Sequence, residues 1–353
     1  MKKLDKGFRM PSAAYTLPRK AIKGYIPIEQ PPKIGDVLYG QVDTIGQHSS
    51  LENSQGRIHT IHPGTKATFV FGNRYAPDYY EGIIPDTTNF ENLDLLARSG
   101  VIGQVVSKSG KVISPTTIKP IGYACDLTGE ILNTRSFSLI KPKNIEKKFP
   151  RAKLILAIGT AMNSGKSAAA TACVYALSVH DKEVRASKVT GTASLKDILS
   201  MNDAGATHYS DFSFMGYPAT YLIDESEVTT IFDKLDMKYA NNKENYWVVE
   251  FADGINQRET AMLLRSETVR KRIHKLIFCA ADSFGAIGGL EVLKNKFNLI
   301  PDAISGVCSS SPLHIKELSE YTDIPVFNSL NIKSQELFKI LTTTRKRTQN
   351  HKS

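Results

Sequence analysis

The segment IGTAMNSGKS, residues 158–167, combines a glycine-rich stretch with Gly-Lys-Ser, residue types that bind phosphate. It follows the apolar run 154–158 and leads into an alanine-rich stretch that begins at Lys166. A loop between a strand and a helix directs its backbone N–H groups and the helix N-terminus at one place, which suits phosphate oxygens. We therefore predict a phosphate-binding loop in which Lys166 contacts the terminal phosphates and Ser167 ligates Mg²⁺.

The spacing of this loop departs from the common pattern by one position, because Thr160 stands where the first glycine is expected. GTAMNSGKS resembles the loop of dethiobiotin synthetase and its relatives, which reads Gly-Thr, four residues, then Gly-Lys and a hydroxyl residue. The resemblance implies ATP as the bound nucleotide. It also implies that these loop residues hold it: Gly159, Thr160, Asn163, Ser164, Gly165, Lys166, Ser167 and Ala168.

Two further segments match that family in order along the chain. ASKVTGT ends with Lys188, Thr190 and Gly191, where the family has a lysine at the end of its second strand and a glycine soon after. VVEFADG places Glu250 at the end of an apolar strand, where the family has a glutamate that helps hold Mg²⁺. The resemblance implies that Lys188 is catalytic on the acceptor side, with Thr190 and Gly191 beside the substrate.

The loop after Glu250 carries two more candidates. Asp253 is either a helix N-cap or the residue that orients an attacking group, and we include it among the catalytic residues. Arg258 is either a bidentate clamp for a substrate carboxylate or part of a solvated helix face. Asp211, or alternatively Asp203, could complete the Mg²⁺ shell or cap a helix. His208 is either an acid–base group or a surface residue.

The segments 279–293 and 306–312 complete the resemblance, which covers about residues 154–330. They imply that Gly285 borders the substrate and that Ser309 lies near the nucleotide base. The chain departs from the family at Ala161, Asp253, Gly288-Gly289 and Ser309. Phosphate and metal positions are therefore kept while substrate and base contacts differ. The later segments look more like the C-terminal domain of DUF1611-like proteins than like a biotin-pathway enzyme.

The resulting expectation is an ATP- and Mg²⁺-dependent enzyme that activates a carboxylate or carbamate of a small-molecule acceptor, with a ligase or kinase outcome. The alternative is a nucleotide-dependent switch or nucleic-acid-associated ATPase, in which a barrel and basic tails bind a polyanion. An aromatic cluster in the segment 71–81, with Arg74, Tyr75, Tyr79 and Tyr80, could stack bases or pack a loop onto a barrel rim. The resemblance also implies a homodimer.

The chemistry must be positioned by an α/β fold. Apolar strand candidates alternate with helix candidates after residue 153, which predicts a mostly parallel sheet flanked by helices. The strands are expected at 154–158, 183–189, 246–251, 275–280, 303–307 and 325–327, and the helices at 166–179, 194–201, 225–236, 256–272, 289–297 and 313–321.

Short strands with frequent turns precede that region and predict an all-β barrel-like domain. We therefore predict a basic flexible lead-in (1–35), a barrel (36–141), a basic linker (142–153), a nucleotide-binding domain (154–332) and a basic tail (333–353).

Composition limits the function classes. The chain has 353 residues, of which 41% are hydrophobic and 23% charged, and a net charge of +10. No run approaches the roughly 20 apolar residues that span a bilayer, so we expect a cytoplasmic protein without a membrane partner. Segments 1–24, 140–153 and 337–353 carry +6, +5 and +5, so the rest of the chain is net acidic. The four cysteines are far apart, which favours buried thiols over a metal or disulfide site.

Overall fold

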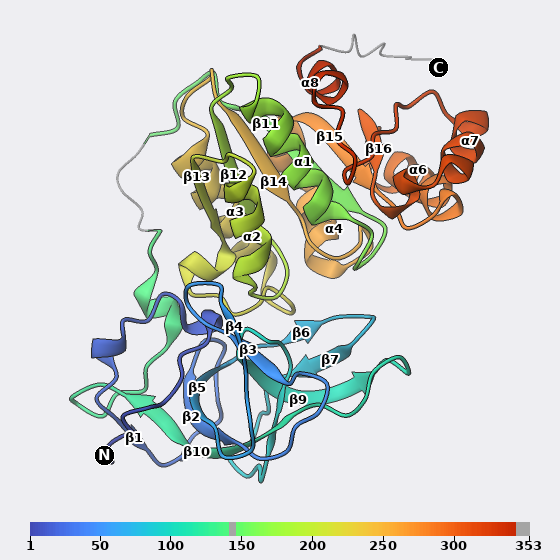
Figure 1. Ribbon diagram of the computed structural model, residues 1–353. Coiled ribbons are helices and arrows are strands. Elements are labelled where there is room, and N and C mark those ends of the chain that lie inside the picture. Colours follow the sequence, from blue (N-terminus) through green and yellow to red (C-terminus); the bar gives the residue numbers. More distant parts are fainter. Residues whose placement is uncertain (141–145, 344–353) are drawn as a thin grey trace.

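The computed structural model describes residues 1–140 and 146–343. A domain of β-strands occupies one half of the molecule, and a domain of alternating strands and helices occupies the other half (Figure 1). The parallel sheet with flanking helices confirms the predicted α/β class, and an N-terminal region of sheet is present.

The strands of the first domain form a closed ring. β8 pairs with both β10 and β9, and the path β10-β2-β5-β9 joins these two strands from the other side, so the sheet closes into a barrel. Its interior is filled by Leu38, Phe69, Ile102 and Ile118, all fully buried. The bounds are β1 Gly24–Ile26, β2 Val37–Val42, β3 Ser50–Glu52, β4 Ile58–Thr60, β5 Lys66–Phe71, β6 Arg74–Tyr75, β7 Tyr80–Ile83, β8 Leu93–Leu95, β9 Val101–Lys108 and β10 Thr117–Cys125, with short 3₁₀ helices at Ser12–Ala14, Arg19–Ala21 and Thr134–Phe137.

The segment 1–35, predicted as a flexible lead-in, packs on the barrel in the structure. β1 pairs with β10, and the backbone N–H of Arg9 donates to Lys66 O at 2.9 Å. Ala13 and Ala14 are buried in the core shared with the second domain. The prediction rested on the many charged residues of this segment. The apolar residues between them, Ala13, Ala14 and Leu17, are buried and hold the segment against the folded domains.

The second domain is a six-stranded sheet in the order β13-β12-β14-β11-β15-β16, with every pair parallel. The strands are β11 Lys153–Gly159, β12 Val184–Lys188, β13 His208–Asp211, β14 Tyr246–Glu250, β15 Ile273–Cys279 and β16 Ala303–Ser305. The helices are α1 Lys166–Ser178, α2 Leu195–Asp203, α3 Glu225–Tyr239, α4 Arg258–Arg265, α5 Glu267–Arg272, α6 Ser283–Phe297, α7 Pro312–Tyr321 and α8 Ser334–Thr342, with 3₁₀ turns at Phe212–Met215 and Val307–Ser310.

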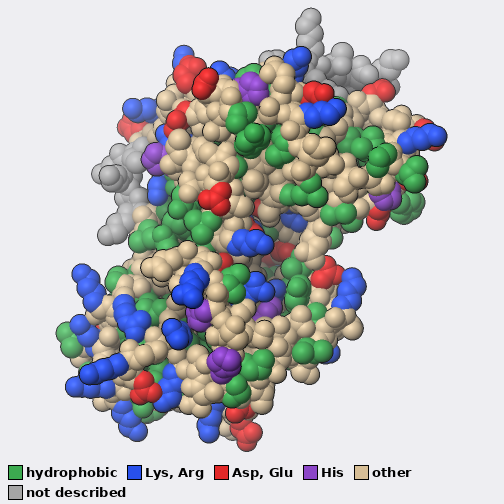
Figure 2. Space-filling model, in the orientation of Figure 1, with side chains coloured by type: hydrophobic (Ala, Val, Ile, Leu, Met, Phe, Trp, Pro, Cys, Tyr) green, Lys and Arg blue, Asp and Glu red, His purple; other side chains and the backbone are tan. Residues whose placement is uncertain are grey.

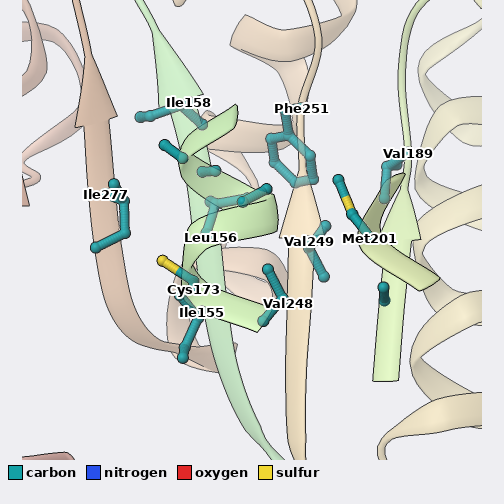
Figure 3. Close-up of a cluster of buried hydrophobic side chains, with 14 of the residues drawn as sticks. Ile155, Leu156, Ile158, Cys173, Val189, Met201, Val248, Val249, Phe251 and Ile277 are labelled. Atoms are coloured by element: carbon teal, nitrogen blue, oxygen red, sulfur yellow. The ribbon is translucent and has the colours of Figure 1, made fainter. Parts of the chain in front are cut away.

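The connections place helices on both faces of this sheet. The chain moves one way from β11 to β12 to β13 and then back through β14 to β15 and β16, so right-handed crossovers put α1 and α2 on one face and α3 to α6 on the other. α8 packs on α1. The core between α1 and the central strands is apolar, and Figure 3 shows Leu156, Val249, Phe251, Cys173 and Ile277 within it.

Several elements differ from their expected bounds. The expected helix 256–272 is divided at Ser266, which ends α4 and caps α5 by accepting from Val269 N. α6 begins at Ser283 rather than 289, because Asp282 caps it by accepting from Gly285 N at 2.6 Å. The expected strand 325–327 is reduced to a bridge between Ile304 and Val326. β13 has no counterpart among the expected strands.

The predicted tail and linker also contribute to the fold where the structure describes them. Leu337 and Leu341 of α8 are buried against the domain, and residues 344–353 of the predicted tail lie outside the described residues. In the linker, residues 142–145 lie outside the described residues, whereas Arg151 is buried and pairs with Asp236 at 2.6 Å.

The two domains share one hydrophobic core. Val70, Leu96 and Val101 of the barrel belong to the same buried cluster as the strands of the second domain. Polar contacts add to it, since Thr134 Oγ1 donates to Gly216 O at 2.6 Å. Among the described helices, none combines the length and the apolar character that crossing a bilayer requires.

Candidate functional site

The predicted site residues of the sheet lie at the carboxyl ends of neighbouring strands. Lys188, the last residue of β12, is in register with Glu250 at the end of β14 on one side. On the other side it is in register with Asp211 at the end of β13. Ligands of open parallel sheets bind beyond these ends, and here the barrel covers them (Figure 1).

The loop between β11 and α1 makes a sharp turn into the helix. Gly165 caps α1 with φ of 92°, and a Cβ there would lie 2.7 Å from Gly306 Cα, so only glycine fits. Lys166 is buried, and its Nζ donates to Ala161 O at 2.6 Å. Desolvation lowers the pKa of Lys166. The lysine therefore folds back over its own loop, beside the N-terminus of a 13-residue helix.

Ser167 and Glu250 lie next to this loop and contact each other. Ser167 Oγ donates to Glu250 Oε1 at 3.1 Å. Glu250 is only 1% exposed, and its Oε2 has no hydrogen-bond partner among the described residues. A hydroxyl and a carboxylate oxygen fit Mg²⁺, which uses few protein ligands together with phosphate oxygens. No group of three or more His, Cys, Asp or Glu that could hold a metal by itself gathers within residues 1–140 and 146–343.

Lys188 lies beside this pair with a carboxylate of its own. Its Nζ donates to Asp197 Oδ2, from the first turn of α2, and lies 3.9 Å from Glu250 Oε1. Desolvation lowers the pKa of Lys188, but the two carboxylates outweigh it and raise the pKa above its usual range. The ammonium is therefore held charged in a buried position.

Asp253, in the loop after β14, interacts electrostatically with Lys166, Lys188 and Glu250. Its backbone φ is 61°, a left-handed conformation that Asp and Asn tolerate best after glycine. Burial raises the pKa of its carboxyl to about 6, against the opposing effects of Lys166, Lys188 and Arg74. Asp253 is therefore a carboxyl group that is protonated more readily than an exposed aspartate.

These residues line one wall of a cavity of about 560 Å³ that lies between the domains. The space-filling view shows the surface hollowed where the domains meet, with basic and acidic side chains in the hollow (Figure 2). We call its two sides the loop wall and the barrel wall. The loop wall includes Asn163, Gly165, Lys166, Ser167, Ala168, Lys188, Gly191, Asp197, Glu250 and Asp253, and the barrel wall includes His48, Glu52, Arg74, Tyr75, Tyr79, Arg98 and Ser99.

The barrel wall centres on Arg74 and His48. Arg74 Nη1 lies 3.0 Å from His48 Nε2, which also lies 3.1 Å from Leu96 O. The guanidinium stacks over the ring of Tyr79 at 5.3 Å, and His48 stacks on the same ring. Burial lowers the pKa of Arg74 to about 10, and burial together with Arg74 lowers the pKa of His48 to about 4. His48 is therefore neutral near pH 7.

The structure does not bring every predicted site residue to this cavity. Arg258 Nη1 donates to Ile223 O at 2.8 Å and pairs with Glu259 at 2.5 Å, so the predicted carboxylate clamp is used within the protein. Thr190 is buried behind the wall, where its Oγ1 accepts from Ala252 N at 2.9 Å. Thr190 thus ties two loops together and is not among the cavity-lining residues.

Asp211, Gly285 and Ser309 also lie away from it. Asp211 caps a 3₁₀ turn by accepting from Ser213 N at 2.8 Å, and β12 separates it from β14. Gly285 lies in the first turn of α6, and Ser309 Oγ donates to Gly306 O at 2.6 Å in the turn after β16. That turn packs against the loop wall, since Val307 N donates to Ser164 O at 3.2 Å.

Sequence reasoning missed Asp197 as the partner of Lys188, and on the barrel wall it missed His48, Glu52, Arg98 and Ser99. A signal for Asp197 exists, because it stands in the first turn of an expected helix nine residues after Lys188. Arg74 and Tyr79 were noticed only as candidates for base stacking. His48 and Glu52 gave no signal, because they reach the cavity through contacts with residues far away in the chain.

Comparisons with known proteins give a distant structural likeness. The signal recognition particle receptor FtsY from Elizabethkingia anophelis, in complex with GDP, is 11% identical over 60% of this chain and 70% of that chain, with a TM-score of 0.38. FtsY from Mycoplasma mycoides is 14% identical over 56% of this chain and 69% of that chain, with a TM-score of 0.35.

A ParA family ATPase from Chlorobium tepidum TLS is 14% identical over 54% of this chain and 90% of that chain, with a TM-score of 0.33. No family model and no curated protein matches the chain. The TM-scores are too low to carry a functional argument, so that argument rests on the geometry of the cavity.

Proposed function

We propose that this protein is an ATP- and Mg²⁺-dependent enzyme that transfers the γ-phosphoryl group to a carboxylate or carbamate of a small molecule. The observation that carries the proposal is the arrangement of Lys166, the Ser167–Glu250 pair and Lys188 along one wall of the interdomain cavity. Phosphoryl transfer needs aligned reactants and positive charge around the transferred group, and this wall supplies both.

The position of each residue in the cavity determines its proposed role. The loop 159–165 and Lys166 bind the phosphates of ATP, and Ser167 with Glu250 holds Mg²⁺, which neutralises phosphate charge. Lys188 lies beside Glu250, where it orients the acceptor oxygen against the γ-phosphorus. That oxygen attacks phosphorus, the bond to the bridging oxygen breaks, and ADP leaves with the electron pair. An acyl phosphate forms without any proton transfer.

The buried position of the reacting groups supports an enzyme over a nucleic-acid-driven switch. Tyr75 and Tyr79, the aromatic residues considered for base stacking, line the cavity beside the loop wall. Tyr75 also packs against Tyr221 of the second domain with ring centroids 5.5 Å apart. A cavity of about 560 Å³ is of the size that holds small ligands.

The test is product formation with Mg-ATP and mixtures of small carboxylic acids. Hydroxylamine traps an acyl phosphate as a hydroxamate, so ADP and hydroxamate are expected in equal amounts. Lys188→Ala is expected to lower turnover by about 10²- to 10³-fold while ATP still binds, because a charge at the reacting oxygens is lost. Lys182→Ala, an exposed lysine remote from the cavity, is the matched control. ATP hydrolysis that needs a polynucleotide and gives no hydroxamate would support the switch instead.

A further inference from the structure

The barrel wall holds a buried positive charge that the protein itself does not neutralise. Arg74 is 7% exposed and lines the cavity. Within residues 1–140 and 146–343 it forms no ion pair, and its Nε is buried without a hydrogen-bond partner. A buried charge without a partner lowers the stability of the fold. A bound anion would offset this cost.

The neighbours of Arg74 do not provide that compensation. Among the described residues, its one side-chain hydrogen-bond partner is His48, a neutral imidazole, and Tyr79 offers only the face of its ring. Glu52, the acidic residue of the same wall, accepts from Leu195 N at 3.0 Å and Lys196 N at 3.2 Å. Its carboxylate is therefore engaged with the start of α2.

Across the cavity, Asp253 influences the pKa of Arg74 but does not pair with it. Both side chains line the cavity, and no ion pair between them is formed in the described part of the chain. A guanidinium presents several N–H donors in one plane, the geometry that matches the two oxygens of a carboxylate or phosphate.

We propose that Arg74, positioned by His48 and Tyr79, binds an oxyanion of the acceptor substrate, a carboxylate or a phosphate group, on the barrel wall. This inference rests on the proposed function and adds the substrate class. The acceptor carries a second anionic group besides the one that is phosphorylated. One end reaches Lys188 on the loop wall while the other end is held by Arg74.

The probes are malonate and inorganic phosphate, titrated calorimetrically into the full chain saturated with Mg-ADP. The wild-type chain is expected to bind one or both. Arg74→Gln is expected to weaken that binding at least about tenfold, because a charge-assisted bidentate contact is lost. Arg98→Gln removes an exposed arginine of the same wall and is expected to change the binding less than about threefold, as a screened surface charge does. Equal losses in the two variants, or no binding by the wild type, would overturn the proposal.

A second titration tests whether the oxyanion that Arg74 binds belongs to the acceptor or to the nucleotide. A non-hydrolysable ATP analogue and ADP are titrated into Arg74→Gln, and both affinities are expected to stay within about twofold of wild type, because the proposed contact is on the acceptor. Weaker binding of the analogue alone would mean that Arg74 contacts the γ-phosphate, which overturns the assignment. The proposed function is tested separately. If the ATP affinity of Lys166→Ala equals that of the wild type, the proposed function fails, whatever the result for Arg74.

A wild-type measurement covers the case in which Arg74→Gln does not fold. Crystals of the Mg-ADP complex soaked in malonate are expected to show a carboxylate within hydrogen-bonding distance of the Arg74 guanidinium. Malonate found only at the loop wall would contradict the proposal.

Discussion

The two walls of the cavity balance their charges in different ways. On the loop wall, Lys188 is paired with Asp197, and Glu250 accepts from Ser167. On the barrel wall, Arg74 contacts the neutral His48, and no carboxylate forms an ion pair with Arg74 in the described part of the chain. On the loop wall the charge of Lys188 is therefore paired within the protein, whereas we propose that the charge of Arg74 on the barrel wall is paired by a ligand. The predictions below test this difference.

The largest effect is expected for Glu250→Gln on the loop wall. Glutamine keeps the size of the side chain and an acceptor for Ser167, but it removes the charge that suits Mg²⁺. The Mg²⁺ affinity of the ATP complex is expected to fall by about 10- to 100-fold, measured by titrating Mg²⁺ at fixed ATP. Asp211→Asn is the matched comparison, because Asp211 lies at the same level of the sheet but away from the cavity. An equal loss of Mg²⁺ affinity in Asp211→Asn would indicate that Asp211 also binds the metal and would contradict its placement away from the site.

The next effect concerns the contact that joins the walls. Glu52→Ala removes both acceptors for the N–H groups of Leu195 and Lys196 at the start of α2. We expect a loss of about 2 kcal/mol in the free energy of unfolding, because buried donors are left unsatisfied. Urea unfolding followed by circular dichroism measures it, with the exposed Glu29→Ala as control. A change no larger than that of the control would show that the contact does not stabilise the interface.

Asp253→Asn tests the electrostatic junction between the walls. The folded pKa of about 6 lies above the usual value of 3.8 for an aspartate, so the wild-type carboxyl destabilises the fold as it ionises. This penalty is absent at low pH, develops between about pH 4 and pH 6, and is complete above that range. Asparagine avoids it and tolerates the left-handed φ.

The stability of Asp253→Asn relative to wild type is therefore expected to rise by about 1–3 kcal/mol between pH 4 and pH 7.5. Urea unfolding of both proteins across this range measures the difference. A constant difference would show that Asp253 ionises normally in the folded chain.

The smallest effect is expected where the walls touch at the surface. Asn163 Nδ2 donates to Asp78 Oδ2 at 2.8 Å, and Lys111 pairs with Asp78 at 3.0 Å. Because Lys111 is exposed, Asp78→Asn is expected to change the free energy of unfolding by less than about 1 kcal/mol. Thermal unfolding with and without Mg-ATP checks this. A larger loss would mean that the rim of the cavity, and not only its core, holds the domains together.

The loop wall could be predicted from the sequence because its residues are local in the chain. Gly159 to Ser167 form one strand–loop–helix unit, and Lys188 and Glu250 each end an apolar strand. Parallel strands bring such ends to one edge of the sheet, so their proximity follows from the pattern.

The barrel wall could not be predicted in the same way. His48 and Arg74 meet through the closure of the barrel, and Glu52 reaches α2 from 143 residues away. Arg258 shows the converse case, since its pattern fits a substrate clamp but Glu259 beside it is fully buried and pairs with it. A sequence shows which residue types are present, but pairing of charges is decided by tertiary contacts.

The most direct test of the account is a calorimetric titration of Mg-ATP into the wild-type chain and into Lys166→Ala. The loop wall is expected to bind Mg-ATP, and loss of the Lys166 ammonium is expected to weaken binding at least about tenfold, because a charged hydrogen bond to phosphate is removed. Equal affinity in the two proteins would contradict the assignment of residues 159–167 as the phosphate-binding loop.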